Sequence, residues 1–232
     1  MTAVLASPGD AAAITGGQPA TIQDAPYEVA LIDLITHGFS DCAGVLISPT
    51  AAIFPAHCMA DKDVTSIGIL SGTADLAGAG PGAMLSGASS IAINPGFDPG
   101  SLKNDIALVK LRGSASAPSA KLPVDPSIPE SLVMTGWGAG GIGEPVSESL
   151  KKADFLLLPN LTCDLELGKS LPAGALCFSS VTAANCDGDS GDPLSNSGTV
   201  YGFSIGVGFC EKGRDGFGTK IFPYLDWIKS LA

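Results

Sequence analysis

The sequence predicts an all-β protein of short antiparallel strands that close into barrels. Short apolar runs recur along the 232 residues, and Gly, Pro, Ser and Asp separate them. Glycine is plentiful at 30 residues, which suits a chain with many tight turns at positive φ. Closing such strands into barrels leaves no sheet edge exposed. We expect strands at 27–35, 44–47, 106–111, 155–158 and 199–206.

Two further segments complete the predicted organisation. Residues 112–129 are rich in Ser, Ala and Pro, a composition typical of a linker between two halves. We place the linker at 114–130, between an N-terminal barrel at 14–113 and a C-terminal barrel at 131–232. Near the C-terminus, two apolar residues stand three apart behind Pro223, which predicts a short helix.

Composition and charge exclude several classes of protein. Hydrophobic residues make up 45% of the chain and charged residues 15%, which excludes general disorder. No apolar run is long enough to span a membrane, so we expect a soluble protein. The net charge of −11 and the pI near 4.4 argue against nucleic acid or an anionic membrane as partner, because phosphate contacts need clustered Lys and Arg. Six widely spaced cysteines indicate an oxidising compartment, and about fifteen pairings are open to them.

The most informative stretch is 186–194, which reads Cys-Asp-Gly-Asp-Ser-Gly-Asp-Pro-Leu. It places Ser190 between glycines and beside an aspartate. A serine nucleophile needs a base to accept its proton and N–H donors to hold the oxyanion, and Gly188 suits the second role because it lacks Cβ. By itself the stretch is equally compatible with a glycine-rich turn that has no chemical role.

A base and a carboxylate are present elsewhere in the chain. Of the two histidines, His37 and His57, the second directly precedes Cys58, and a disulfide at that cysteine would hold an imidazole in place. Asp105 stands at the start of the apolar run 106–111, where a buried carboxylate can accept the Nδ1–H of an imidazole. Each has an ordinary alternative, as a structural histidine or a cap at a strand end. The order His, Asp, Ser differs from the serine-first order of the α/β-hydrolases.

With these motifs, the chain resembles the chymotrypsin family of trypsin-like serine proteases. Ile-Thr-Gly-Gly at 14–17 is similar to the mature N-terminus of that family, and Met-Thr-Gly-Trp-Gly at 134–138 is similar to a signature of its second barrel. The match covers nearly the whole chain beyond its first thirteen residues. The resemblance implies two six-stranded antiparallel barrels and a short C-terminal helix. It places His57 and Asp105 on the first barrel and Ser190 on the second, with the active site between them.

The resemblance also implies a mechanism. His57 would act as general base on Ser190, oriented by Asp105, and an acyl-enzyme would form and be hydrolysed. The N–H groups of Gly188 and Ser190 would hold the oxyanion. The chain would thus be a secreted, extracellular serine endopeptidase. The family pattern pairs the six cysteines as Cys42–Cys58, Cys163–Cys177 and Cys186–Cys210.

Residues 1–13 are interpreted as a propeptide, because they lack the basic start of a signal peptide. In the family, cleavage frees the amine at the position of Ile14, and this amine pairs with the aspartate beside the serine, here Asp189. Such a buried ion pair is sensitive to the loss of either partner. Residues 11–13 are all alanine, so an activating protease would have to accept small residues. The alternative is a frayed tail without a role.

The substrate pocket is assigned from the resemblance. Its floor falls on Ala184 and its walls on Gly206 and Gly216, while Ser204 belongs to the edge that pairs with the substrate backbone. The neutral floor disfavours Lys or Arg at P1. Glycine walls leave room for a large apolar side chain such as Phe, Tyr, Leu or Met, whose burial favours binding.

A second preference, for acidic P1 residues, stays open at this stage. Lys212 or Arg214 on the following loop could reach into the pocket. We rank this preference below the apolar one, because Phe203 stands where the glutamate-specific members of the family carry a pocket histidine.

Several positions depart from the family pattern. Asp192 replaces a glycine two residues after the nucleophile, and Pro55 replaces an alanine before Ala56 and His57. Ile205 stands at a tryptophan position and Gly218 at a tyrosine position. The first two departures keep a second class of function open, a catalytically silent homologue that binds protein partners through the same cleft.

We expect no cofactor and no metal site, because the cysteines are assigned to disulfides and one of the two histidines to the triad. Expected partners are protein or peptide substrates, an activating protease and proteinaceous protease inhibitors. We expect the protein to be a monomer. Asn160 begins a glycosylation sequon, which matters only in a eukaryotic secretory protein.

Overall fold

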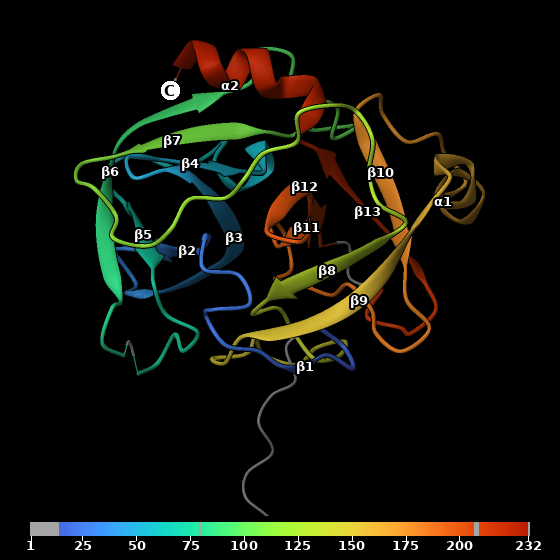
Figure 1. Cartoon of the computed structure of the whole chain (residues 1–232), viewed down its shortest axis with the longest axis horizontal. Coiled ribbons are helices and arrows are strands. Elements are labelled where there is room, and N and C mark those ends of the chain that lie inside the picture. Colours follow the sequence, from blue (N-terminus) through green and yellow to red (C-terminus); the bar gives the residue numbers. More distant parts are fainter. Residues whose placement is uncertain (1–13, 79, 207–208, 232) are drawn as a thin grey trace, which may run out of the picture.

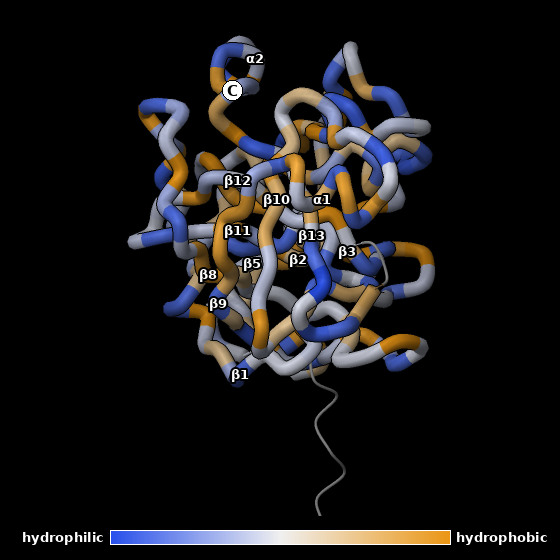
Figure 2. Tube along the Cα trace, turned by 90° about the vertical axis from the view of Figure 1, so that its right-hand side faces the viewer, coloured by the Kyte–Doolittle hydropathy of each residue, from blue (hydrophilic) through white to orange (hydrophobic). Residues whose placement is uncertain are grey.

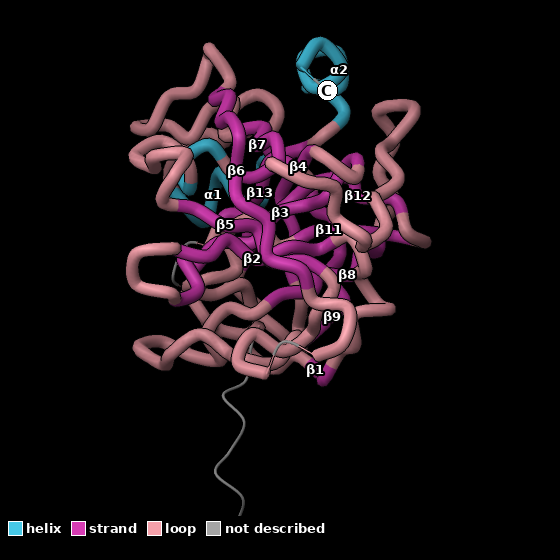
Figure 3. Tube along the Cα trace, turned by 90° about the vertical axis from the view of Figure 1, so that its left-hand side faces the viewer, coloured by secondary structure: helices cyan, strands magenta, loops and turns pink. Residues whose placement is uncertain are grey.

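The structure, a computed structural model, describes residues 14–78, 80–206 and 209–231. Two β-barrels lie side by side, the N-terminal one coloured blue to green and the C-terminal one yellow to red (Figure 1). Strands make up the body of the molecule, and the described α-helix is confined to two short segments (Figure 3). The predicted class, all-β with two six-stranded antiparallel barrels and a C-terminal helix, is confirmed. The predicted propeptide lies outside the described residues.

The N-terminal barrel has the strand order β2-β3-β4-β7-β6-β5, and pairing of β5 with β2 closes it. Its interior is filled by fully buried side chains such as Leu46, Phe54, Ile69 and Val109. Figure 2, which views the molecule from the side of the C-terminal barrel, shows hydrophobic and hydrophilic residues interspersed along the chain. The strands are β2 (Glu28–Asp33), β3 (Gly38–Ser48), β4 (Ala51–Phe54), β5 (Ile67–Ser71), β6 (Met84–Ile93) and β7 (Ala107–Leu111).

The C-terminal barrel has the order β8-β9-β10-β13-β12-β11, closed by pairing of β11 with β8. In its core the rings of Phe155 and Phe178 meet edge to face, with 5.4 Å between their centroids. Ile14 is fully buried in the same core, just before the short strand β1 (Gln18–Pro19) that pairs with β9. The barrel strands are β8 (Ser131–Gly136), β9 (Lys151–Leu158), β10 (Ala175–Ser179), β11 (Pro193–Asn196), β12 (Thr199–Ile205) and β13 (Asp215–Lys220).

A third group of buried side chains joins the two barrels. Val45 and Ile53 of the first barrel pack in one cluster with Val200 and Phe203 of the second, and Ile228 of the C-terminal helix belongs to it. This helix, α2 (Leu225–Leu231), therefore packs at the junction (Figure 1). None of the described helices is long and apolar enough to cross a membrane. The other helical segments are η1 (Ala56–Cys58), α1 (Asn160–Leu167) and η2 (Phe222–Tyr224).

The segment from 112 to 130 runs between β7 and β8 without forming a strand. The N–H of Ala120 donates to the carbonyl of Leu46 at 2.8 Å, and the N–H of Val200 donates to the carbonyl of Lys121 at 2.9 Å. The connecting segment is therefore hydrogen-bonded to both barrels, and this helps to fix one barrel against the other.

Candidate active site

An imidazole, a carboxylate and a hydroxyl from three distant parts of the chain meet between the barrels. His57 lies in the turn η1 that follows β4, and Asp105 lies two residues before the start of β7, the neighbour of β4 in the barrel. The His57 Nδ1 lies 2.6 Å from Asp105 Oδ2, and its Nε2 lies 3.1 Å from Ser190 Oγ. With the proton on Nδ1 donated to the carboxylate, Nε2 is the acceptor for the serine hydroxyl. The three predicted triad residues therefore form one hydrogen-bonded line.

Asp105 is held from several directions. Its carboxylate is fully buried, and its Oδ1 accepts the backbone N–H of His57 at 2.8 Å. Its carbonyl accepts the hydroxyl of Thr219 on β13 at 3.2 Å. The neighbouring Asn104 accepts the hydroxyl of Tyr224 at 3.1 Å. Both barrels thus take part in orienting the carboxylate that faces the imidazole.

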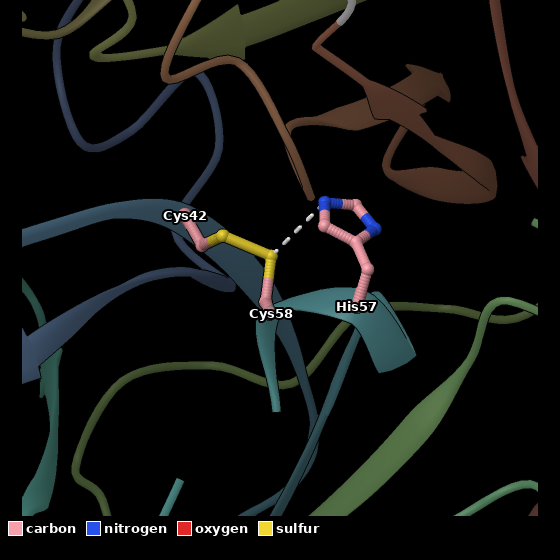
Figure 4. A group of neighbouring side chains, drawn as sticks. All are labelled: Cys42, His57 and Cys58. Atoms are coloured by element: carbon pink, nitrogen blue, oxygen red, sulfur yellow. Dashed lines mark hydrogen bonds between the residues drawn. A yellow bond between two sulfur atoms is a disulfide. The ribbon is translucent and has the colours of Figure 1, made fainter. Parts of the chain in front are cut away.

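A disulfide supports the base. Figure 4 shows the bond between Cys42 on β3 and Cys58 in η1, with the Sγ of Cys58 lying 3.5 Å from the Nε2 of His57. The carbonyl of Ser190 accepts the N–H of Ala43, next to that disulfide, at 2.7 Å. Strand β3 therefore anchors the turn that carries the base and the loop that carries the hydroxyl.

The remaining predicted pairs are also disulfide-bonded. The structure contains Cys163–Cys177, which ties α1 to β10, and Cys186–Cys210, which ties the start of the serine loop to the segment after β12. Together with Cys42–Cys58 these are the three pairs that the family resemblance implied. The sulfur atoms are therefore bonded to one another and are not available as thiolate ligands for a metal.

The loop around Ser190 is tightly packed against the first barrel. Gly191 has φ near +90°, and a Cβ there would overlap the carbonyl oxygen of Ala43 and lie 3.0 Å from the ring of Pro55. Only glycine fits this approach. Pro55, one of the departures noted in the sequence, thus lies directly against the serine loop. Gly188, the predicted oxyanion donor, also has a positive φ of 86°.

Gly206 lies closer to the nucleophile than its predicted place in a pocket wall suggests. Its N–H donates to Ser190 Oγ at 3.0 Å, and a Cβ on it would lie 2.7 Å from the carbonyl of Cys186. The hydroxyl of Ser190 therefore accepts from Gly206 while it faces the imidazole of His57. Residues 207 and 208, which continue this segment, are outside the described residues.

The other predicted pocket residues lie on three separate segments of the chain, and in the described part of the chain only Ser204 is hydrogen-bonded to the serine loop. Ala184 is buried and pairs with Thr15, whose carbonyl accepts its N–H at 2.9 Å. The carbonyl of Ser204 accepts the N–H of Gly191 at 2.8 Å, so one of its lone pairs remains for another donor. Gly216 on β13 faces the ring of Phe178 on the neighbouring strand.

The two cations of the loop after β12 have other partners. Arg214 pairs with Glu166 of α1 at 2.7 Å and lies 4.8 Å above the ring centre of Phe209. The end of the Lys212 side chain lies beside Gly16, where it would touch a Cβ at 2.5 Å. The second histidine, His37, is exposed in the turn between β2 and β3. In these positions Lys212, Arg214 and His37 make no contact with the triad in the described part of the chain.

Three carboxyl groups are fully buried behind the serine loop. Asp189 and Asp192 flank Ser190, and Glu28 comes from β2 of the other barrel. Burial raises the pKa of Glu28 to about 8 and that of Asp189 to about 7, and it raises the pKa of Asp192 well above its usual range. Glu28 was not among the residues predicted from the sequence. Its signal was an acidic residue inside the apolar run at 27–35.

A serine hydroxyl, an imidazole and a buried carboxylate in one line, supplied by two packed β-barrels, define a serine peptidase of the two-barrel class. The sequence model of the trypsin family matches residues 14–228. The chain belongs to the trypsin family and is a serine endopeptidase.

Curated relatives agree with this assignment along nearly the whole chain. Trypsin I-P38 of Gallus gallus is 29% identical over 228 residues, which cover 94% of this chain and 88% of the relative. Trypsin-1 of Astacus astacus is 27% identical over 236 residues, covering 94% of this chain and all of the relative. Serine protease 1 of Homo sapiens is 27% identical over 245 residues, with 99% and 94% coverage.

Proposed function

We propose that this protein is a secreted endopeptidase that cleaves protein substrates after large apolar residues and is activated by cleavage before Ile14. The observation that carries the catalytic part is the line from Asp105 through His57 to Ser190, with contacts of 2.6 and 3.1 Å. Secretion is supported by the three disulfides, which form and persist in oxidising compartments.

In the proposed reaction, His57 Nε2 accepts the hydroxyl proton while Ser190 Oγ attacks the scissile carbonyl carbon. The buried carboxylate of Asp105 stabilises the imidazolium that forms. The N–H groups of Gly188 and Ser190 hold the oxyanion. The imidazolium then protonates the leaving amine, and water hydrolyses the acyl-enzyme with His57 again acting as base. The N–H of Gly206 occupies one lone pair of Ser190 Oγ, so the other lone pair is the one available for the attack.

The proposed preference for apolar P1 residues rests on the residue types at the pocket positions. Ala184 offers no carboxylate to a basic side chain, which separates this pocket from one that selects Lys or Arg. The acidic alternative is weakened because Arg214 is paired with Glu166 and stacked on Phe209. Peptides that differ only at P1 test the preference. Faster cleavage after Phe or Leu is expected, and preferred cleavage after Arg or Lys would contradict our interpretation of Ala184.

The proposed activation rests on Ile14 and Asp189. The side chain of Ile14 is fully buried in the second barrel, and the carbonyl of Thr15 accepts the N–H of Ala184, so residues 14 and 15 are docked beside the serine loop. An amine released at Ile14 would supply a cation to the buried Asp189.

Labelling of the serine by a fluorophosphonate tests nucleophile and activation together. We expect labelling of Ser190 after removal of residues 1–13, little labelling of the full chain, and none in Ser190→Ala. A folded, processed sample that stays unlabelled would instead favour the silent homologue. The observation that supports a silent homologue is the hydrogen bond from the N–H of Gly206 to Ser190 Oγ, which blocks one approach to the hydroxyl.

A further inference from the structure

The serine loop carries an aspartate, Asp192, whose carboxyl group is buried without an ordinary partner. It is fully buried, and neither of its oxygens meets an N–H or O–H donor in the described part of the chain. Oδ1 of Asp189 and Oε1 of Glu28 are also buried without a hydrogen-bond partner among the described residues. A charged carboxylate in such a place would lose its hydration without replacement, which costs far more than burying the neutral acid.

Space for the Asp192 side chain is provided by a glycine on the opposite strand. A Cβ at Gly136, the last residue of β8, would overlap both oxygens of Asp192. A Cβ at Gly138 would overlap Oδ1 of Asp189 in the same way. The segment 136–138 therefore leaves room for two carboxyl groups side by side, with Trp137 between the glycines pointing elsewhere into the core.

The two aspartates stand three residues apart in one turn, and their carboxyl groups lie against Gly136 and Gly138 of the same segment. A hydrogen bond between two carboxyl groups requires that one of them keeps its proton. Asp189 is the better acceptor, because its Oδ2 already accepts the N–H of Cys186 at 2.7 Å, a bond that favours the carboxylate. Asp192 has no such bond among the described residues and is the better donor.

We propose that Asp192 is a positioning residue: as a neutral carboxylic acid it donates a hydrogen bond to the Asp189 carboxylate and holds the loop that carries Ser190. This inference rests on the proposed function in one respect, that this loop carries the nucleophile. The backbone fits the role, since the N–H of Asp192 donates to the carbonyl of Asp189 at 3.2 Å and the N–H of Ser204 donates to the carbonyl of Asp192 at 2.9 Å.

The titratable groups that act on the pair are mainly acids. In its charged form Glu28 on β2 raises the pKa of Asp192, and Asp187 raises the pKa of Asp189 from within the loop. Lys151 of β9, which pairs with Gly136 across the strands, is buried but forms no ion pair within the described ranges. The negative neighbours favour retention of a proton on Asp192. An amine freed at Ile14 would add a positive charge near Asp189 and would favour loss of a proton from the pair. The full chain and the processed chain therefore have to be compared.

Infrared spectroscopy of the full chain tests the proton directly, because Ile14 then has no free amine. At pH 7 we expect the C=O stretch of a protonated carboxylic acid, and a weaker band in Asp192→Asn. The matched control is Asp154→Asn, which changes an exposed acid on β9 and is expected to keep the wild-type band. A band of equal strength in Asp192→Asn, or no band in the wild type, would overturn the proposal.

The pH profile of fluorophosphonate labelling tests the positioning role in the processed chain. We expect the wild type to lose labelling rate at alkaline pH as the proton leaves Asp192, and Asp192→Ala to be about tenfold slower already at pH 6. Asn donates at every pH, so Asp192→Asn is expected to recover most of that loss and to show a weaker alkaline decline. Glu28→Gln removes a group that becomes negatively charged at alkaline pH, which should lower the pKa of Asp192, so the decline is expected to move to lower pH.

These outcomes separate the two proposals. A wild type that is folded and processed but never labelled contradicts the proposed function, while the infrared band still tests the proton. A wild type that is labelled, with an alkaline decline that is unchanged in Asp192→Asn and Glu28→Gln, contradicts the role of Asp192 alone. Such a result would point to the Ile14 amine as the titrating group.

Discussion

Asp105 and Asp192 are two fully buried aspartates with opposite surroundings. The carboxylate of Asp105 faces two nitrogen donors of His57, at 2.6 and 2.8 Å. The carboxyl group of Asp192 meets no such donor in the described residues, and burial together with the charges of Asp189 and Glu28 raises its pKa. Burial alone therefore does not decide what an acid does in this protein. Donors stabilise the charge of the first, and their absence leaves the second with a proton.

The same chemical change at the two aspartates is expected to give the largest contrast. Asp105→Asn keeps the volume but loses the acceptor for the imidazole, so kcat/KM should fall by about four orders of magnitude. Asp192→Asn keeps the donor that we propose, so it should differ from the wild type by only a few fold at pH 6. Steady-state kinetics on processed chains measure both. Equal losses in the two variants would remove the distinction between them.

Stability should depend on pH in the direction set by the buried acids. The pKa of Glu28 is raised to about 8 and that of Asp189 to about 7 by burial, so between about pH 4.5 and 8 the folded state holds more protons than the unfolded state. The free energy of unfolding of the full chain should therefore be greatest at acidic pH and fall by on the order of a few kcal/mol towards pH 8.

Denaturant unfolding across this pH range checks the direction. Glu28→Gln and Asp192→Asn should each flatten the dependence, because each removes a group that must lose a proton in a buried place. The exposed acid replaced in Asp154→Asn should leave the slope as in the wild type. A wild type that gains stability from pH 5 to pH 8 would contradict this account.

Gly136→Ala tests whether the carboxyl group of Asp192 fills the space beside Gly136. The added Cβ would overlap the Asp192 carboxyl group, so the free energy of unfolding should fall by about 1–3 kcal/mol. On the background of Asp192→Gly the same substitution should cost clearly less, because the overlapping group is gone. Thermal unfolding of the four proteins in this cycle measures the coupling, and additive effects would show that Asp192 does not fill this space.

The smallest effect is expected where an acid is paired at the surface. Asp24 binds Lys152 at 2.6 Å, and this hydrogen bond holds the pKa of Asp24 below its usual value. Both side chains are partly exposed, so water screens the pair. Lys152→Ala should change the free energy of unfolding by no more than about 1 kcal/mol. A larger change would mean that Lys152 has a further role in β9.

The motifs of the triad could be predicted because each is local in the sequence. A serine between glycines, a histidine beside a cysteine and an aspartate before an apolar run are recognisable one at a time, and the resemblance supplied their order. Some of the strands were harder to predict from the sequence. β6 is rich in Ser, Gly and Ala, and β13 contains two glycines within six residues. Pairing with neighbours, and not propensity, makes such segments strands.

Glu28 shows a second limit of prediction. Its hydroxyl partner, Thr135, lies 2.5 Å away but 107 residues further along the chain. The sequence shows an acid within an apolar strand, but not which strand of the other barrel faces it. The position of Gly206 is similar. The family resemblance assigned it to a pocket wall, while its hydrogen bond to Ser190 depends on the path of the chain after β12.

The sequence by itself determined the residue types: a nucleophile, a base, an acid, six cysteines in matching places, and strands with one apolar face. The tertiary structure alone decided which acids receive donors and which do not. Protonation depends on groups within a few ångströms, and in a β protein those groups come from strands that are far apart along the chain. The contrast between Asp105 and Asp192 is for this reason a property of the packed barrels.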